Sequence, residues 1–319
     1  MKVLTVTNMW PIESHKYFGI FVKEQVEGLN KYYPEVKNNV IFINGRENKL
    51  NYLLSILKVN WHLLQNKYDL VHIHFGLSGL FLIANPFLRI PVITMLHSAD
   101  IDIAKSNKLF ILISKLVVGR SKHVFYLNQK MNEILGKCSA TLEYLPCGVN
   151  TNDFQPTPTL TRNSSIKIAF PASSKRPEKN YKLFKEIIDL LHDKHNILAE
   201  TVEIHDKSRT EVCEILNSVD IVLMTSISEG SPQIIKEAMS CNRPVVSSAV
   251  GDVAYLLENV KNSYVIDSYN AVDYLNPILN ILKQGPENRI SNGRDRIFEI
   301  GLDEKKISEK IFSAYSSVI

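Results

Sequence analysis

Short runs of β-branched and other apolar residues alternate along the chain with longer runs whose apolar positions recur every three to four residues. This alternation is typical of parallel βαβ units, because each buried strand is followed by a helix that covers the sheet. In the first half the predicted strands are Lys2–Thr7, Val40–Ile43, Leu70–His74, Val92–Leu96, His123–Leu127 and Thr141–Leu145. In the second half they are Ile166–Phe170, Thr201–Ile204, Ile221–Thr225, Val245–Ser248 and Tyr264–Ile266. The pattern therefore predicts an α/β protein with two doubly wound domains in tandem.

The alternation is interrupted once, by a stretch from Pro146 to Ser165 that is rich in Pro, Asn, Thr and Ser. Because this stretch has little apolar periodicity, it is the best candidate for a linker. We predict a Rossmann-like domain over residues 1–150, a linker over 151–165, a second Rossmann-like domain over 166–300, and a C-terminal helix over 301–319 that packs back on the first domain. Sheets of this kind bind ligands outside the carboxyl ends of their strands, so we expect a site in a cleft between facing domains.

Composition narrows the class of protein. A hydrophobic share of 45% with 22% charged residues is that of a soluble globular protein. The longest apolar runs fall short of the roughly 20 residues that cross a bilayer, and the first residues do not resemble a secretory signal. Four scattered cysteines without zinc-ligand spacing indicate reduced thiols and a cytoplasmic protein. A net charge of +4 without a basic arm gives no reason to expect a nucleic-acid partner.

Three features at predicted strand ends of the first domain are candidates for chemistry. Gly19 precedes a helix that starts near Ile20, where a glycine lets backbone N–H groups approach a phosphate, although a glycine at such a junction is more often only a turn residue. His97 directly follows a strand and could contact a sugar or phosphate, or be a satisfied structural histidine. Asp100 and Asp102 match a metal-binding DxD pattern, but a capping role for Asp100 is favoured and no metal ligand is predicted. No glycine-rich dinucleotide or P-loop motif occurs.

In the second domain a basic loop follows the first predicted strand. It contains Lys175, Arg176 and Lys179 and precedes a helix that starts near Asn180. Three cations at the carboxyl end of a strand suit a diphosphate, whose charge must be neutralised when it acts as a leaving group. The alternative is a solvated basic loop.

Two glutamates flank a Gly-Ser-Pro turn in the same domain. With Ser231 as N-cap and Pro232 at the first helical position, Glu229 lies in the loop before the helix and Glu237 inside it. Glu237 would be displaced by about 7–8 Å along the helix axis from the first turn. That separation is too large for the carboxylate pair of a retaining glycosidase, which needs about 5–5.5 Å. It suits two contacts on one extended ligand, whose negative charge the free N–H groups of residues 230–233 would favour.

These motifs carry a family resemblance. The segment "EGSPQIIKE" resembles the E-x7-E motif of retaining GT-B glycosyltransferases of family 4, and "AMSCNRPVVSSAVGDVAYLLE" is similar to its continuation. The segments "LPCGVNTNDFQP", "LHSAD" and "GIFV" resemble further motifs of that family, so the likeness covers nearly the whole chain. It implies a GT-B fold, with two Rossmann-like domains facing across a cleft.

The resemblance implies roles for individual residues. Glu237 would hold the ribose of a nucleotide, Glu229 the transferred sugar near its reacting carbon, and His97 the sugar. The implied catalytic residues are Glu229, Arg176, Lys179 and His97, and the implied donor-binding residues are Glu237, Gly19, Lys175, Gly230, Ser231, Gln233 and Ile234. Three positions depart from the family pattern. The basic pair in "KRPEK" is closer than usual, so either Lys175 or Arg176 could fill the first role, and Asn242 and Ser263 stand where glycine is usual.

The implied function is retaining transfer of a sugar from a UDP- or GDP-linked donor to an acceptor hydroxyl, with no cofactor or metal, in bacterial surface polysaccharide or glycolipid biosynthesis. The acceptor would be a glycan or a lipid-linked glycan. Two alternatives stay open: a GT-B sugar-nucleotide epimerase, active with donor alone, and a noncatalytic partner in a glycan-assembly complex.

A basic apolar segment bears on location. The stretch from Lys105 to Lys122 has an apolar body bordered by cations, including Lys108 and Lys115. It predicts either a helix that packs within the domain or one that contacts an anionic membrane. The family's acceptors favour the second, which implies a cytoplasmic protein held peripherally at the inner membrane face.

Overall fold

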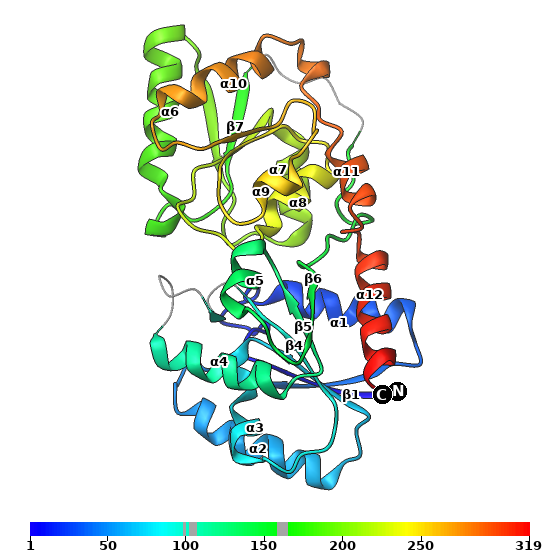
Figure 1. Ribbon diagram of the computed structural model, residues 1–319. Helices are drawn as coiled ribbons and strands as arrows, with labels where there is room; N and C mark the ends of the chain where they lie inside the picture. Colours follow the sequence, from blue (N-terminus) through cyan, green and yellow to red (C-terminus); the bar gives the residue numbers. More distant parts are fainter. Residues whose placement is uncertain (98–99, 102–106, 158–164) are drawn as a thin grey trace. The chain divides into compact units, whose positions relative to one another are not determined.

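The computed structural model describes residues 1–97, 100–101, 107–157 and 165–319. It divides into two compact units (Figure 1). Unit 1 comprises Met1–Cys147 together with Glu304–Ile319, and unit 2 comprises Gly148–Asp303. Each unit is built on one parallel sheet.

The sheet of unit 1 has the strand order β2-β1-β3-β4-β5-β6. Its strands are β1 (Lys2–Thr7), β2 (Lys37–Phe42), β3 (Leu70–His74), β4 (Val92–Met95), β5 (His123–Tyr126) and β6 (Thr141–Tyr144). The central strands β3 and β4 are buried at every residue, as expected for a parallel sheet that helices cover on both faces. All six strands lie where the sequence pattern predicts them, with ends that differ by at most a few residues.

The helices of unit 1 include a segment from the far end of the chain. They are α1 (Ile20–Tyr32), α2 (Asn51–Gln65), α3 (Leu80–Ala84), α4 (Lys108–Arg120), α5 (Gln129–Leu135) and α12 (Glu304–Val318), with the 3-10 turn η1 (Gly76–Gly79). Helix α12 packs against α1, where the ring of Phe312 stacks on Tyr33 at a centroid distance of 4.1 Å. The Tyr315 hydroxyl lies 2.7 Å from Nδ1 of His72 on β3. The C-terminal helix thus contributes to the core of unit 1.

The sheet of unit 2 has the order β11-β10-β9-β7-β8. Its strands are β7 (Ile166–Phe170), β8 (Ala199–Glu203), β9 (Ile221–Met224), β10 (Val245–Ser248) and β11 (Tyr264–Ile266). The helices are α6 (Tyr181–His195), α7 (Arg209–Ser218), α8 (Gln233–Ser240), α9 (Val253–Leu256), α10 (Val272–Leu282) and α11 (Gly293–Glu299), with 3-10 turns η3 (Pro177–Lys179) and η4 (Pro286–Asn288). One apolar core joins α6 and α10 to the sheet through Phe170, Phe184 and Tyr274.

The first part of the predicted linker packs into unit 2. Phe154 is fully buried, and its carbonyl accepts hydrogen bonds from Ser240 Oγ at 2.6 Å and Arg294 Nη1 at 2.8 Å. A single aromatic residue in a polar stretch gives no periodic signal, so the sequence pattern does not reveal this anchor. Residues 158–164 of the predicted linker lie outside the described residues.

Each sheet has one point where the strand order reverses. In unit 1 it lies between β1 and β3, and in unit 2 between β7 and β9. Loops on the two sides of such a point diverge and leave a crevice at the carboxyl ends of the strands, where doubly wound proteins bind ligands. The loops after β1, β3, β7 and β9 are therefore the candidate ligand-binding loops.

Two absences hold for the part of the chain that the structure describes. Within it, no helix combines the length and apolar character needed to span a bilayer. The same residues contain no group of three or more His, Cys, Asp or Glu side chains that could hold a metal ion.

Candidate functional site

The loops after β7 and β9 are fastened to each other in unit 2. The hydroxyl of Thr225, at the end of β9, donates to the carbonyls of Lys179 at 3.1 Å and Asn180 at 3.0 Å. The backbone N–H of Ile227 donates to the Glu178 carbonyl at 2.9 Å. The turn η3 and the segment that leads to α8 are thereby held as one assembly at the reversal point of the sheet.

A lysine and a glutamate meet across these two loops. Lys179 Nζ donates a hydrogen bond to Glu229 Oε1, and the two side chains are only 13% and 14% exposed. An ion pair removed from water to this degree has a large desolvation cost, which the Coulomb attraction and the charge-assisted hydrogen bond offset. The structure thus brings together two of the residues that the sequence analysis selected for different roles.

The other two predicted cations of this loop are exposed. Lys175 and Arg176 both lie in the solvent-facing part of the loop, and Arg176 Nε donates to Glu178 Oε1 at 2.7 Å. Of the three basic residues, Lys179 is the one that the fold fixes beside Glu229. The ion pair of Arg176 with Glu178 is solvent-exposed, so it contributes little to stability.

The second glutamate, Glu237, has its own cation. Its side chain is 3% exposed on α8, and Oε1 accepts a 2.7 Å hydrogen bond from Nη1 of Arg209. The guanidinium of Arg209 also lies 4.5 Å from the centroid of the Phe154 ring. Packing on the ring from one side and pairing with the carboxylate on the other orient Arg209 and, through it, Glu237.

Sequence reasoning missed Arg209. It is the first residue of α7, which begins with a capping box in which Ser208 and Glu211 bond to each other's backbone. That motif identifies a helix start but says nothing about the cation within it. The available signal was position, because Arg209 opens the helix that follows β8, on the same edge of the sheet as the other strand ends.

The start of α8 differs from the prediction. Pro232 occupies the N-cap with extended dihedral angles, so the helix begins at Gln233, and the prediction of Ser231 as N-cap is wrong. The Ser231 hydroxyl instead accepts a 3.1 Å hydrogen bond from Nζ of Lys236, a fully buried lysine that the sequence analysis did not select. The Gln233 side chain also has a structural hydrogen bond, because its Nε2 donates to the Gly148 carbonyl at 2.7 Å. Ile234 lies half-buried on the same turn.

The loop after β10 determines the position of Gly230. Gly251 has φ of +59°, and a Cβ at this position would lie 2.4 Å from the Gly230 carbonyl oxygen. Only glycine allows both the left-handed backbone and this approach. Gly251 therefore supports the segment that carries Glu229, a role that the sequence analysis did not assign.

The departures from the family pattern have local explanations. Asn242 adopts φ of +53°, a left-handed conformation that asparagine tolerates better than most residues. Ser263 does not carry a positive φ, since the neighbouring Asn262 does, at +57°. Its hydroxyl accepts a 3.2 Å hydrogen bond from the backbone N–H of Val245.

Gly19 and His97 belong to unit 1. Gly19 has φ of +73°, and a Cβ there would lie 2.3 Å from the carbonyl carbon of Met9. The glycine is thus required by a backbone contact with the loop after β1, and it also provides the N-terminal end of α1. His97 is buried at the end of β4, with its ring centroid 5.9 Å from His74 and 5.4 Å from Phe21.

Asp100 secures the backbone around His97. Its carboxylate accepts hydrogen bonds from the backbone N–H of Gly76 at 2.7 Å and of His97 at 2.5 Å. Burial raises the pKa of Asp100 to about 8, against these two hydrogen bonds, and lowers the pKa of His97 to about 3, so that this histidine is neutral at physiological pH. Asp102 lies outside the described residues.

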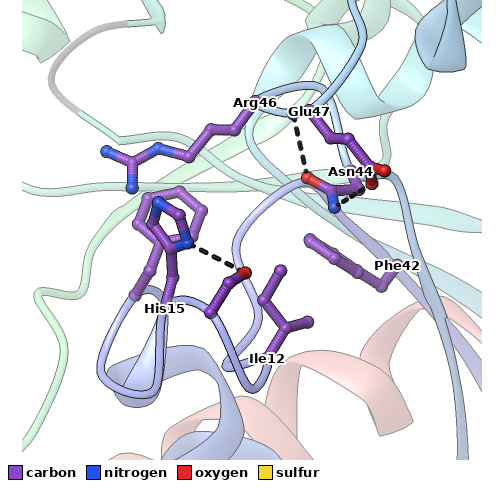
Figure 2. Close-up of a pocket in the computed structure, with 8 residues that line it drawn as sticks. Ile12, His15, Phe42, Asn44, Arg46 and Glu47 are labelled. Atoms are coloured by element: carbon purple, nitrogen blue, oxygen red, sulfur yellow. Dashed lines mark hydrogen bonds between the residues drawn. The ribbon is translucent and has the colours of Figure 1, made fainter.

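A pocket of about 350 Å³ lies in unit 1 at the loops after β1 and β2 (Figure 2). Arg46 reaches over one wall, with its guanidinium 3.9 Å from the centroid of the Phe18 ring. The opposite wall carries Asn44, whose side-chain amide donates to Glu47 Oε2 at 2.8 Å. The remaining lining residues are Ile12, Ser14, His15 and Phe42. Half-exposed aromatic surface with polar edges and a cation suits an anionic or hydroxylated ligand such as a sugar.

Comparison with known protein families gives two matches. The model described as glycosyl transferases group 1 matches residues 168–284, and the model described as glycosyltransferase family 4 matches residues 24–153. Among curated relatives, the putative teichuronic acid biosynthesis glycosyltransferase TuaC of Bacillus subtilis is 24% identical in an alignment of 218 positions that covers 59% of this chain and 55% of the relative. A D-inositol 3-phosphate glycosyltransferase of a Mycobacterium species is 26% identical over 96 residues, 30% of this chain and 22% of the relative. The chain thus spans about half the length of the first relative, or less for the second.

Solved structures share the fold. A sucrose-phosphate synthase from Thermosynechococcus elongatus superposes with a TM-score of 0.80 at 14% identity, over 99% of this chain and 98% of that one. Anabaena Alr3699/HepE in complex with UDP superposes with a TM-score of 0.75 at 17% identity, over 99% and 100% of the two chains. These likenesses establish the GT-B fold that the sequence analysis predicted. The two family models match separate stretches that together make up more than half of the chain, and they identify it as a group 1 glycosyltransferase.

Proposed function

We propose that the protein transfers a sugar from a nucleoside diphosphate donor to an acceptor hydroxyl with retention of configuration. One observation carries the proposal: at the reversal point of the unit 2 sheet, each of two little-exposed glutamates is held by its own cation, Glu229 by Lys179 and Glu237 by Arg209. Carboxylates that accept hydrogen bonds from hydroxyl groups, next to cations that bind phosphate, match the two chemical ends of a sugar nucleotide. The Alr3699/HepE structures with UDP and UDP-glucose support this class of donor, and UDP and GDP remain the two candidates.

Glu237 is assigned to the ribose. A carboxylate can accept hydrogen bonds from both hydroxyls of a ribose, and Arg209 orients the Glu237 carboxylate by donating a charge-assisted hydrogen bond to it. Because Arg209 is held by the ring of Phe154, the carboxylate is oriented before the ligand arrives.

Lys179 is assigned to the diphosphate and Glu229 to the transferred sugar. An ammonium group has three N–H donors, so Lys179 can bind a phosphate oxygen while it keeps its hydrogen bond to Glu229. When the bond between the anomeric carbon and the phosphate oxygen breaks, its electron pair goes to the phosphate, and Lys179 stabilises the added charge. The acceptor oxygen then bonds to the same face of the sugar, and its proton passes to the leaving phosphate. Arg176 and Lys175, on the exposed part of the loop, would add charge on closure over the donor.

The acceptor is assigned to the pocket beside Arg46 and Phe18 in unit 1. The name of the B. subtilis relative refers to teichuronic acid biosynthesis, and we propose an acceptor of the same broad kind, a glycan or lipid-linked glycan of the bacterial surface. Phe18 offers a flat face to a sugar ring, and Arg46 favours an acidic substituent on it. Four free cysteines suit the reducing cytoplasm, where we propose that the reaction takes place.

The experiment is a two-stage assay. Thermal-shift measurements with UDP, GDP and their common sugar conjugates identify the donor, because a ligand selective for the folded state raises the melting temperature by mass action. The selected donor is then incubated with and without glycan acceptors, and the anomeric configuration of the product is read by NMR. Retained configuration in an acceptor-dependent product supports the proposal. Conversion of the donor without any acceptor would instead show an epimerase, and inverted configuration would refute the assigned mechanism.

A further inference from the structure

One face of helix α2 is apolar and points to solvent. Its leucines and tryptophan recur every three to four residues, as one stripe of a helix requires. The stripe consists of Leu50, Leu53, Leu54, Leu57, Trp61 and Leu64, with exposed fractions of 59%, 58%, 59%, 73%, 63% and 82%. The buried face of the same helix carries Ser55 and Val59. Helix α2 therefore has one face for the core of unit 1 and a second apolar face that the described residues leave open.

The apolar surface continues onto the two neighbouring helices. Helix α3 packs against both α2 and α4, and the three lie in one layer of unit 1 (Figure 1). Phe87, just beyond α3, is 88% exposed, and Ile83 is 44% exposed. Helix α4 buries Ile111 and Val117 against η1 and the sheet, yet exposes Leu109, Leu112 and Leu116. We call this surface, formed by the stripe of α2 with Ile83, Phe87, Leu109, Leu112 and Leu116, the apolar ridge.

The charged residues within the segments that carry the ridge have one sign. Residues 49–67, 80–90 and 108–122 contain eight lysines and arginines and no aspartate or glutamate. The eight are Lys49, Lys58, Lys67, Arg89, Lys108, Lys115, Arg120 and Lys122, and all are exposed. An average part of the surface of this protein would carry charges of both signs, because its net charge is only +4 from 37 basic and 33 acidic residues.

The combination of exposed apolar side chains and cations indicates whether a protein or a lipid surface binds the apolar ridge. Apolar patches of such extent mark interaction sites, and a protein partner would be met by a surface rich in Tyr, Trp, Arg and Met and depleted in lysine. Here the apolar residues are mainly leucines, lysines lie beside them on α2 and α4, and Arg89 follows α3. Apolar side chains that enter the acyl boundary, with cations at the level of anionic headgroups, are the signature of a surface-bound amphipathic helix.

We propose that the apolar ridge of α2, α3 and α4 docks unit 1 on an anionic lipid bilayer, with Trp61 and Leu57 inserted into the interface. The docking does not depend on the transfer reaction, and it assigns the principal contact to α2 rather than to the basic segment of α4 alone. Both faces of α4 are used: one packs within unit 1 and the other joins the ridge.

The test uses the full-length protein and lipid vesicles. The chain has two tryptophans, Trp10 and Trp61, so a Trp10→Phe protein reports on Trp61 alone. We expect a blue shift of its emission, and co-sedimentation, with vesicles of phosphatidylglycerol and phosphatidylcholine but not of phosphatidylcholine alone, with binding that weakens as salt is added. Leu53→Ser/Leu57→Ser/Leu64→Ser should reduce partitioning at least tenfold, and Lys58→Glu/Lys115→Glu should reduce it on anionic vesicles.

Matched controls come from unit 2. Leu198→Ser/Val272→Ser removes exposed apolar residues elsewhere, and Lys185→Glu/Lys194→Glu reverses charge on α6; both should bind as the unaltered protein does. Circular dichroism and a thermal melt confirm that each variant is folded. Absence of binding to anionic vesicles at low salt, or binding that the ridge variants leave unchanged, would overturn the proposal. A dimer detected by light scattering that is lost in the triple serine variant would also overturn the proposal, because a second copy of the chain would then cover the ridge.

Discussion

Arg209 Nη1 lies 2.7 Å from Glu237 Oε1, and this pair joins the first turn of α7 to the second turn of α8. The glutamate belongs to a recognisable motif, whereas the arginine belongs to none. Because Glu237 is 3% exposed, an unpaired carboxylate there would have a high desolvation cost. The pair therefore links stability and binding, and substitutions can separate the two.

Replacing Arg209 by methionine should weaken binding of the nucleoside diphosphate about tenfold or more, because Glu237 loses the donor that orients it. It should also destabilise the protein by about 3–5 kcal/mol, since one charge stays buried without its partner. Isothermal titration with UDP and GDP, together with urea denaturation, measures both. The double variant Arg209→Met/Glu237→Gln should recover much of the stability but none of the affinity. Recovery of both would show that the pair is structural only.

Replacing Lys179 by methionine should lower kcat by about 10²–10³-fold, as loss of one group that stabilises developing charge does. The same change leaves the little-exposed Glu229 without its cation and should lower the melting temperature. Arg176→Ala should reduce turnover without that loss of stability, because its side chain is exposed. Steady-state kinetics and thermal melts of both variants, with Glu178→Gln as a control for the loop, check this. Equal melting temperatures for the Lys179 and Arg176 variants would contradict the structural assignment.

Gly251→Ala should reduce both stability and donor affinity, since its Cβ would lie 2.4 Å from the Gly230 carbonyl oxygen and displace the segment that bears Glu229. Gly136→Ala is the matched control: Gly136 has a similar φ of +61° but nothing within 4 Å of the added Cβ. Because Gly136 has ψ of −151°, outside the left-handed α region, the control isolates backbone strain of the order of 1–3 kcal/mol. Thermal melts and donor titrations should show a larger effect at Gly251. Similar effects at both sites would mean that the Gly230 carbonyl moves away from the added Cβ at little energetic cost.

Acid should destabilise unit 1 through its buried histidines. Burial lowers the pKa of His72 and His97 to about 3, whereas an unfolded histidine titrates near 6.5. The unfolded chain therefore binds protons that the folded chain excludes, and the free energy of unfolding falls as the pH drops from about 6.5 toward 3, by up to about 1.4 kcal/mol per pH unit for each histidine. The pKa of His74 is lowered in the same direction.

Asp100 acts against this trend. Its pKa of about 8 lets the folded chain hold a proton that the unfolded chain has lost, which favours folding as the pH falls from about 8 to 4. Urea denaturation at pH 7.5, 6, 5 and 4 should show a net loss of stability below pH 6.5, because the histidines outnumber the aspartate. His97→Leu should remove one histidine's contribution to the pH dependence. The free energy of unfolding should then fall less steeply between pH 6.5 and 4, by up to about 1.4 kcal/mol per pH unit. An unchanged slope would show that His97 titrates normally.

Arg46→Leu should raise the KM for an acidic glycan acceptor and leave the affinity for the donor unchanged. The reason is that Arg46 lies over Phe18 in a pocket of unit 1, whereas the proposed donor residues belong to unit 2. Acceptor-dependent kinetics and donor titration check this, with Lys23→Leu on the exposed surface of α1 as the control. A loss of donor affinity, or no change in acceptor KM, would remove the pocket from the proposed site.

Local patterns in the chain were enough to predict the architecture of each domain and to identify the motif. Period-two and period-3.6 patterns are local, because they reflect which face of a strand or helix is buried, and they placed β1, β3, β7 and β10 to the residue. The segment that contains Glu229 and Glu237 could be recognised for the same reason: its residues are close in the chain. One-residue features such as the N-cap of α8 were less certain, because Pro232 can serve as well as Ser231.

Which side chains contact each other depends on how the strands and helices pack. Arg209 is 28 residues from Glu237 and Lys179 is 50 from Glu229, and no pattern in the chain specifies such pairs, because they depend on which strand ends are neighbours in the sheet. The burial of Phe154 and the need for glycine at position 251 follow from contacts of the same kind. The apolar stripe of α2 shows the converse: periodicity reveals a helix with apolar faces, but which face the core covers and which stays open depends on the neighbours that pack against it.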